Sequence, residues 1–232
     1  GSGTLASALG MNKVMANQAF RQAGLRVPHG ILLEQPESRE PREIFLLAKE
    51  VFNRIPPYWI VKPADGGSSV GVFKAKNFDA LVEAIYRAFQ YSPRLLVEQC
   101  IEGREATCGV VENFRSHRHY ALPPIEIRKP VGSEIWTYND KYNGATEEIC
   151  PGHFSTEEKQ QISEMAIAAH EALGLRHYSR ADFIISPYGI YLLEINTLPG
   201  MTPESLFPKA LAAVGCSYES FLDHVLTLAL EG

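Results

Sequence analysis

Two carboxylates and an amide lie within two apolar segments late in the chain. The segments are residues 180–185 and 190–196, and they carry Asp182, Glu194 and Asn196. Oxygen ligands of this kind suit Mg²⁺ or Mn²⁺ better than Zn²⁺. A solvated strand face with incidental charges is the alternative, but the run Leu-Leu-Glu-Ile-Asn is too apolar for an exposed strand. The sequence therefore favours a divalent-metal site.

The two segments are predicted to form a β-hairpin, because turn residues separate them. With a three-residue loop at residues 187–189, Asp182 faces Glu194 and Arg180 faces Asn196. Side chains alternate along a strand, so these four polar groups then share one face. Facing carboxylates repel each other unless a cation or proton lies between them. A two-residue loop would shift the pairing by one and separate the carboxylates, so this expectation depends on register.

A glycine-rich loop, residues 66–71, follows an apolar segment that contains Lys62. Backbone N–H groups and hydroxyls in such a loop can hold phosphate oxygens. The loop is neither a Walker A motif nor a dinucleotide fingerprint, since both of these open a helix, and a plain hairpin turn explains it equally well. A lysine in a buried strand needs an anionic partner, for which a nucleotide phosphate and an internal carboxylate are the two candidates.

Glu98 and Glu105 flank residues 99–104, where one predicted strand ends and the next begins. Backbone groups at such a crossover can meet the edge of an adenine, with a carboxylate placed for ribose hydroxyls. A surface turn with ordinary charges is the alternative, and without further context it is favoured.

A Gly-, Pro-, Asn- and Asp-rich stretch, residues 130–152, predicts a long functional loop. Within it, Lys141 and Tyr142 are candidates for a lid pair that meets phosphate and substrate, and a flexible surface loop is the alternative. Lys13 starts a predicted helix and, taken alone, cannot be told from a solvated lysine.

Bulk composition excludes several classes of protein. The 232 residues carry a net charge of −5, which gives no basic field for nucleic acid. The short cluster His117-Arg118-His119 is interpreted as a solvated hairpin tip. No apolar run approaches the roughly 20 residues that span a bilayer, and the N-terminus lacks a basic segment followed by an apolar one. We expect a cytoplasmic protein without nucleic-acid or membrane partners.

The four cysteines lie too far apart for zinc spacing, apart from the first pair, which has no flanking histidine. They are predicted to be reduced thiols.

The predicted elements form two consecutive α+β units. Helices are expected from residue 12 to Gly24, from residue 41, from the Asn77 cap, from a Ser155–Glu158 capping box to Gly174, and at 204–214 and 218–230. Besides the hairpin, strands are expected at 58–63, 70–75, 94–98, 105–111 and 120–127.

These residues, in this order, resemble the ATP-grasp superfamily and more closely the D-alanine–D-alanine ligases. The matching segments are residues 1–3 and 6–9 with Lys13, residues 61–63 and 67–71, Glu98 with Glu105, Lys141 with Tyr142, Arg180 with Asp182, and residues 193–202. The match runs across essentially the whole chain, and the joint pattern is highly specific although no single piece would be.

The resemblance implies an α+β ATP-grasp fold, with the nucleotide between two subdomains. Residues 1–11 would be a linker remnant from an N-terminal domain, 12–98 the central subdomain and 99–232 the C-terminal subdomain. ATP would be bound by Lys13, Lys62, Gly67, Ser69 and Lys141 at the phosphates, by Glu98, Gln99, Cys100 and Ile101 around adenine, and by Glu105 at the ribose. Two Mg²⁺ (or Mn²⁺) ions would be held by Asp182, Glu194 and Asn196.

The resemblance also implies the reaction: two D-alanines are joined through an acyl phosphate, for peptidoglycan precursor synthesis. Arg180 and the Gly200 backbone would stabilise the tetrahedral intermediate. Ser68 and Tyr142 would orient the first amino acid, and Ser205 and Leu206 would contact the carboxylate of the acceptor. Another amino-acid or carboxylate–amine ligase, and a catalytically silent nucleotide-binding module, are the alternative functions.

Ligases of this family carry a further N-terminal domain, whereas this sequence begins where that domain would be ending. We therefore expect a fragment, one half of a split enzyme or a shortened relative. Weak or absent dipeptide synthesis by the chain alone is expected, with a separate N-terminal domain or a homodimer as the partner.

Overall fold

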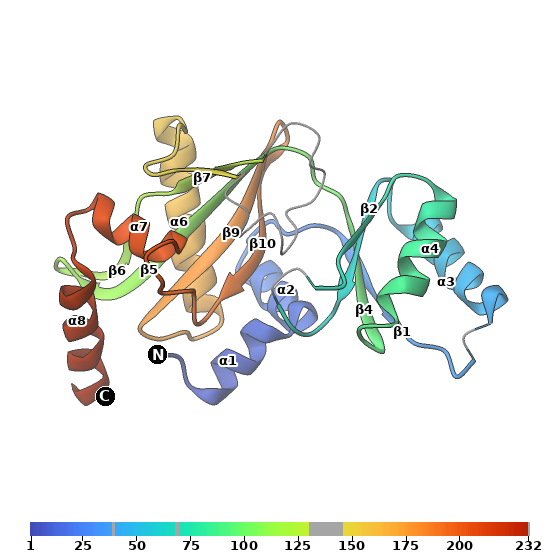
Figure 1. Cartoon of the computed structure of the whole chain (residues 1–232), viewed down its shortest axis with the longest axis horizontal. Helices are drawn as coiled ribbons and strands as arrows, with labels where there is room; N and C mark the ends of the chain where they lie inside the picture. Colours follow the sequence, from blue (N-terminus) through green and yellow to red (C-terminus); the bar gives the residue numbers. More distant parts are fainter. Residues whose placement is uncertain (39, 68–69, 130–145, 232) are drawn as a thin grey trace.

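Two antiparallel sheets organise the chain (Figure 1), in a computed structural model that describes residues 1–38, 40–67, 70–129 and 146–231. The helices are α1 (Thr4–Met11), α2 (Lys13–Gln22), α3 (Pro41–Arg54), α4 (Phe78–Ala88), α6 (Thr156–Ala172), α7 (Leu206–Ala213) and α8 (Tyr218–Glu231). The strands are β1 (Gly30–Glu34), β2 (Trp59–Pro63), β3 (Phe73–Ala75), β4 (Arg94–Gln99), β5 (Arg104–Phe114), β6 (His117–Ala121), β7 (Ile125–Arg128), β8 (Glu147–Ile149), β9 (Tyr178–Ser186) and β10 (Gly189–Asn196).

The smaller sheet has the strand order β1-β4-β2-β3, and α3 and α4 pack against it. The helix α3 buries Ile44, Ala48 and Val51, whose spacing places them on one helical face. The predicted Asn77 cap of α4 is confirmed, because its side chain accepts a hydrogen bond from the Ala80 N–H at 2.8 Å. This lobe therefore has its own apolar core on one side of its sheet.

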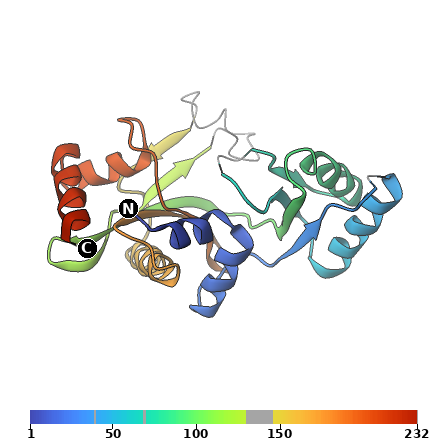
Figure 2. The ribbon, with the colours of Figure 1, turned by 90° about the horizontal axis from the view of Figure 1, so that it is seen from below.

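The larger sheet runs β10-β9-β5-β7-β8, with β6 paired to β5. Alternate residues of β5 face opposite sides, so Cys108 and Val110 join the core under α6 while Val111 joins the core under α7 and α8. Figure 2 shows α6 and the α7–α8 pair on opposite sides of this sheet. Gly109 allows the α7 contact, since a Cβ there would lie 2.8 Å from a ring carbon of Phe207.

The capping box predicted for α6 is confirmed. Glu158 N–H donates to the Ser155 hydroxyl at 3.1 Å, and Ser155 N–H donates to the Glu158 carboxylate at 2.8 Å. The helix ends at Ala172, and the predicted stop residue Gly174 follows with a φ of +60°, the left-handed conformation that favours glycine. The sequence signals therefore located both ends of this helix.

Two features differ from the expected elements. The predicted strand at 120–127 is divided into β6 and β7, and the Leu122 N–H between them donates to the Gly109 carbonyl at 2.8 Å. The stretch expected to be a linker contains α1, whose Ala6 and Leu9 pack against the larger core. The alanine and leucine residues of this stretch favour a helix. In the described part of the chain, no helix combines the length and apolarity needed to cross a membrane.

The helix α2 begins at the predicted Asn12 cap, whose side-chain oxygen accepts from the Met15 N–H at 3.0 Å. Its Ala16 and Phe20 belong to the core of the larger sheet, together with residues of α6, β9 and β10. The domain boundaries at residues 12 and 99 stay a prediction, but the apolar contacts of α2 are made with the larger lobe.

Replacing Phe20 with alanine tests this packing. Phe20 is fully buried, whereas Met15 on the same helix is 47% exposed. We expect Phe20→Ala to lower the free energy of unfolding by about 3–5 kcal/mol, and Met15→Ala by about 0.5 kcal/mol or less. Urea unfolding followed by circular dichroism measures both values, and equal losses would contradict the packing of α2 in the larger core.

Candidate functional site

A cleft of about 890 Å³ lies between the two sheets. Its walls come from β2 and β4 on one side and from β5, β7, β9 and β10 on the other. The predicted site residues that line it are Lys13, Lys62, Gly67, Glu98, Gln99, Cys100, Ile101, Glu105, Asp182 and Glu194. Residues far apart in the sequence thus meet in one cavity large enough for a nucleotide.

The hairpin β9–β10 places the two carboxylates opposite each other, although its loop differs from the prediction. Ser186 pairs with Gly189, so the loop has two residues rather than three. The register then shifts between Leu192 and Glu194, and Asp182 pairs with Glu194 after all. Leu193 is the extra residue of this β-bulge, and it offsets the shorter loop. The predicted loop was wrong, and the predicted pairing is confirmed.

Hydrogen bonds from neighbouring side chains fix the carboxylate of Asp182. Arg180 donates from Nε and Nη2, each at 3.0 Å, and the Asn196 amide donates at 3.3 Å. The Thr107 hydroxyl donates at 2.6 Å from the neighbouring strand β5. Burial alone would lower the pKa of Arg180, but the Asp182 carboxylate raises it. Arg180 therefore stays charged, and Asn196, on the same face, completes a set of oxygen donors that fits Mg²⁺ or Mn²⁺.

Lys62 and Glu98 form a buried ion pair across β2 and β4. Lys62 Nζ lies 2.6 Å from Glu98 Oε2, and the two side chains are 10% and 3% exposed. The Asn17 amide of α2 donates to the other oxygen of Glu98 at 2.8 Å. Of the two partners considered for Lys62, the internal carboxylate is therefore the one present here. Sequence reasoning missed Asn17, which has no distinguishing pattern within its helix.

Lys13 lies at the start of α2, beside the loop that follows β2. The side-chain Nζ of Lys13 donates to the Gly66 carbonyl at 2.6 Å, and the backbone N–H of Lys13 donates to the Ala64 carbonyl at 2.9 Å. Burial lowers the pKa of Lys13, the Glu194 carboxylate opposes this shift, and the charge of Lys62 adds to it. Two lysines from different elements thus lie near each other in the cleft, and one of them is already paired with a carboxylate.

Backbone hydrogen bonds connect the end of β4 and the residue after it to two other segments. Gln99 N–H donates to the His29 carbonyl at 2.8 Å, and Cys100 N–H donates to the Tyr58 carbonyl at 2.7 Å. These contacts hold Gln99 and Cys100 in place along the cleft wall.

Two further lysines at this end of the cleft were not predicted. Lys129 forms an ion pair with Glu105, and Lys74 Nζ lies 3.5 Å from Glu102 Oε1. Glu105 was predicted as a site residue, but no sequence spacing indicated that Lys129 would pair with it or that Lys74 would lie near Glu102.

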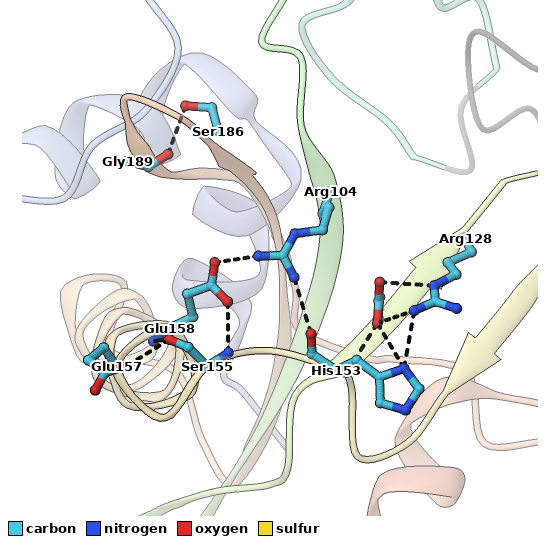
Figure 3. Close-up of polar contacts among 9 residues, drawn as sticks. Arg104, Arg128, His153, Ser155, Glu157, Glu158, Ser186 and Gly189 are labelled. Atoms are coloured by element: carbon cyan, nitrogen blue, oxygen red, sulfur yellow. Dashed lines mark hydrogen bonds and ion pairs between the residues drawn. The ribbon is translucent and has the colours of Figure 1, made fainter.

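Polar contacts at the rim connect β5 and β7 to the start of α6 (Figure 3). Arg104 forms an ion pair with Glu158 and donates to the His153 carbonyl at 3.2 Å. Arg128 lies 3.1 Å from the His153 ring. Burial alone would raise the pKa of Glu126, but hydrogen bonds from Arg128 and from the His153 N–H lower it overall. This wall of the cleft is therefore held by charged groups.

The remaining predicted residues lie outside the cleft lining or outside the described residues. A Cβ at Gly200 would lie 2.8 Å from the Ser205 hydroxyl, so these two residues are neighbours. The Leu206 side chain is buried in the core under α7, so only its backbone could meet a substrate. The predicted residues outside the described part of the chain are Ser68, Ser69, Lys141 and Tyr142.

Comparison with known proteins identifies the family. A family model described as the D-ala D-ala ligase C-terminus matches residues 19–227. The chain belongs to the D-alanine–D-alanine ligase family. A D-alanine–D-alanine ligase of Syntrophobacter fumaroxidans is 41% identical over the full chain, which covers 71% of that protein. The resemblance seen in the sequence is thereby confirmed.

Solved structures of the ligase family share the fold. D-alanyl-alanine synthetase A of Vibrio cholerae has a TM-score of 0.85 at 33% identity, over 100% of this chain and 68% of that one. A D-alanine–D-alanine ligase of Bacillus anthracis complexed with ATP has a TM-score of 0.79 at 27% identity, over 99% and 69%. The chain thus spans about two thirds of the length of the relatives it matches, and the predicted ATP-grasp fold class is confirmed.

The Lys62–Glu98 pair predicts non-additive stability. Lys62→Met leaves the Glu98 carboxylate buried without its cation, so the free energy of unfolding should fall by about 3–5 kcal/mol. Adding Glu98→Gln to that variant removes the uncompensated charge and should recover part of the loss. Urea unfolding of the two single variants and the double variant, without nucleotide, measures this coupling, and strictly additive losses would refute it.

Proposed function

We propose that this chain is the ATP-binding and catalytic part of a ligase that joins two D-alanines for peptidoglycan precursor synthesis. One observation carries the proposal: the facing carboxylates of Asp182 and Glu194 share a cleft with Lys13 and Lys62. Two facing carboxylates beside two lysines suit a nucleoside triphosphate with its metal ions. Family membership supports the same reading, as does the ATP complex of the Bacillus anthracis ligase.

ATP is proposed to lie along the cleft, with its phosphates at Lys13, Lys62 and Gly67. Its adenine would lie against residues 98–101, and its ribose hydroxyls would meet Glu105. Two Mg²⁺ ions would be held by Asp182, Glu194 and Asn196, and when bound they supply positive charge to the phosphoryl oxygens. Because Glu98 already pairs with Lys62, Lys62 is oriented before the nucleotide arrives.

The reaction is proposed to proceed in two displacements. A carboxylate is a poor electrophile, so a carboxylate oxygen of the first D-alanine attacks the γ-phosphorus and ADP leaves, giving an acyl phosphate. The lysines offset the charge that develops on the phosphoryl oxygens. The neutral amine of the second D-alanine then attacks the acyl carbon, giving a tetrahedral intermediate that Arg180 and the Gly200 N–H stabilise. The C–O bond to phosphate breaks, and hydrogen phosphate leaves with the proton that the amine loses. Residues 200–206 are proposed to receive the acceptor, through Ser205 and the backbone of Leu206.

The chain alone is proposed to turn over weakly, because its relatives contain a further part that the match does not cover. A separate N-terminal domain, or a second copy of the chain, would complete the pocket for the first substrate. We place the reaction in the cytoplasm, where reduced thiols agree with the four free cysteines of the structure.

An ADP-release assay tests the proposal. With ATP, Mg²⁺ and D-alanine, ADP should form slowly with the chain alone and faster when the N-terminal domain of a longer relative is added. Glu194→Gln should lower the rate by tenfold or more, on the order expected when a charge-stabilising group is lost. The matched control is Glu50→Gln at an exposed position of α3 outside the cleft lining, which should leave the rate unchanged.

The outcomes separate the alternatives. Phosphate release that depends on another amino acid or on D-lactate, but not on D-alanine, would assign a different carboxylate–amine ligase. ATP binding without phosphate release in the presence of any amino-acid or carboxylic-acid substrate, even after the N-terminal domain is added, would reject the proposed catalysis. The chain would then be a silent nucleotide-binding module.

The lowered pKa of Lys13 predicts a pH dependence of nucleotide binding. Only the ammonium form attracts phosphate, and its fraction falls as the pH rises through a pKa below that of an ordinary lysine. ATP affinity should therefore weaken on going from neutral to alkaline pH, whereas Lys13→Arg should keep its affinity because arginine stays charged. Calorimetric titration with ATP across this range measures both, and identical profiles would contradict a phosphate contact by Lys13.

A further inference from the structure

Glu112, His119 and His170 gather at one end of the larger sheet, from β5, β6 and α6. One ligand atom from each of the three lies within 4.8 Å of the others. His170 Nε2 lies 3.5 Å from Glu112 Oε1, and His119 Nε2 lies 3.7 Å from the same oxygen. Two imidazole nitrogens thus point at one carboxylate oxygen, and none of these residues belongs to the nucleotide cleft.

The Nε2 atom of His170 is buried, and among the described residues it has no hydrogen-bond partner. Its 3.5 Å separation from Glu112 exceeds the 2.7–3.2 Å or so of an N–H···O hydrogen bond. A buried polar atom in this position needs a partner. Burial lowers the pKa of His170, against the opposing effect of Glu112.

The other nitrogen of each ring is already engaged. His170 Nδ1 lies 2.8 Å from the Ser179 hydroxyl, and His119 Nδ1 lies 2.8 Å from Glu171 Oε1. An Nδ1–H held by an oxygen leaves Nε2 as the free ligand atom, which is how metal-binding histidines are usually oriented. Both rings therefore present Nε2 toward Glu112.

The position of His119 corrects the interpretation of its sequence cluster as a solvated tip. The β5–β6 pairing sets Glu112 opposite His119, whose side chain is only 8% exposed. Figure 1 shows β6 on the side of the larger lobe away from β2 and β4. From Glu105 in the cleft to Glu112 there are seven residues of β5, or roughly 23 Å at about 3.3 Å per residue.

We propose that Glu112, His119 and His170 form a second metal site, which binds Zn²⁺ and joins α6 to the β5–β6 hairpin. Tetrahedral Zn²⁺ with bonds of about 2.0–2.1 Å sets its ligand atoms roughly 3.3–3.5 Å apart. The 3.5 and 3.7 Å separations need only a small contraction to reach this spacing. The fourth position is left for water, and the nitrogen ligands set this site apart from the oxygen-only donors of the cleft.

Zinc titration of the full chain tests the proposal. The chain is stripped with a chelator and titrated with Zn²⁺ against a chromophoric chelator, with excess Mg²⁺ present to occupy oxygen-only sites. One Zn²⁺ should bind per chain, and Glu112→Gln and His119→Gln should each weaken binding by about tenfold or more. His117→Gln is the matched control, since His117 lies on the same strand and its Nδ1 contacts the Arg115 carbonyl instead. It should bind Zn²⁺ as the unchanged chain does.

Two further measurements distinguish loss of the metal site from loss of folding. Co²⁺ should give the visible absorption of a tetrahedral site in the unchanged chain and in Asp182→Asn, but not in His119→Gln. Zn²⁺ should raise the unfolding temperature of the unchanged chain, of His117→Gln and of Asp182→Asn, but not of Glu112→Gln or His119→Gln. Two results would overturn the proposal: the absence of stoichiometric Zn²⁺ binding, or binding by folded Glu112→Gln and His119→Gln as tight as that of the unchanged chain. Neither result changes the outcome of the ADP-release assay.

Discussion

Setting two carboxylates opposite each other in a half-buried hairpin carries an electrostatic cost, and the surrounding groups are arranged to offset it. Asp182 accepts hydrogen bonds from Arg180 of its own strand β9, from Asn196 of β10 and from Thr107 of β5, so its charge is balanced within the sheet. The negative charge of Glu194 is balanced by the nearby positive charge of Lys13, which lies on α2. The hairpin is therefore complete only when α2 is packed against the larger lobe.

The helix α2 makes this arrangement work because it faces both sheets. Its Phe20 lies in the core of the larger sheet, while its Asn17 donates to Glu98 on β4 of the smaller one. Lys13 and Asn12 at its start contact the loop after β2 through Gly66 and Asp65. One short helix thus connects the two walls of the cleft, and the position of Lys13 depends on both lobes.

The sequence was sufficient where local rules decide the structure. Asn77 and the Ser155–Glu158 pair cap the helices they were predicted to cap, because capping involves residues only a few positions apart. The Asp182–Glu194 pairing was reached through a wrong loop length, since a bulge depends on the twist of the whole sheet and leaves no pattern in the residues. Asn17, Thr107 and Lys129 were missed for a related reason: their partners are distant in sequence.

The two clusters of charged side chains on the larger sheet differ in the chemistry of their donors. Near the cleft, Asp182, Glu194 and Asn196 offer only oxygen, which suits a hard ion that keeps water and phosphate in its shell. At the far end of the same sheet, His119 and His170 add nitrogen, which suits a more tightly bound transition metal. One β-sheet can therefore carry both sets of donors without competition for the same ion. The strands that connect them, β5 and β9, are paired through eight consecutive positions and hold the two ends at a fixed separation.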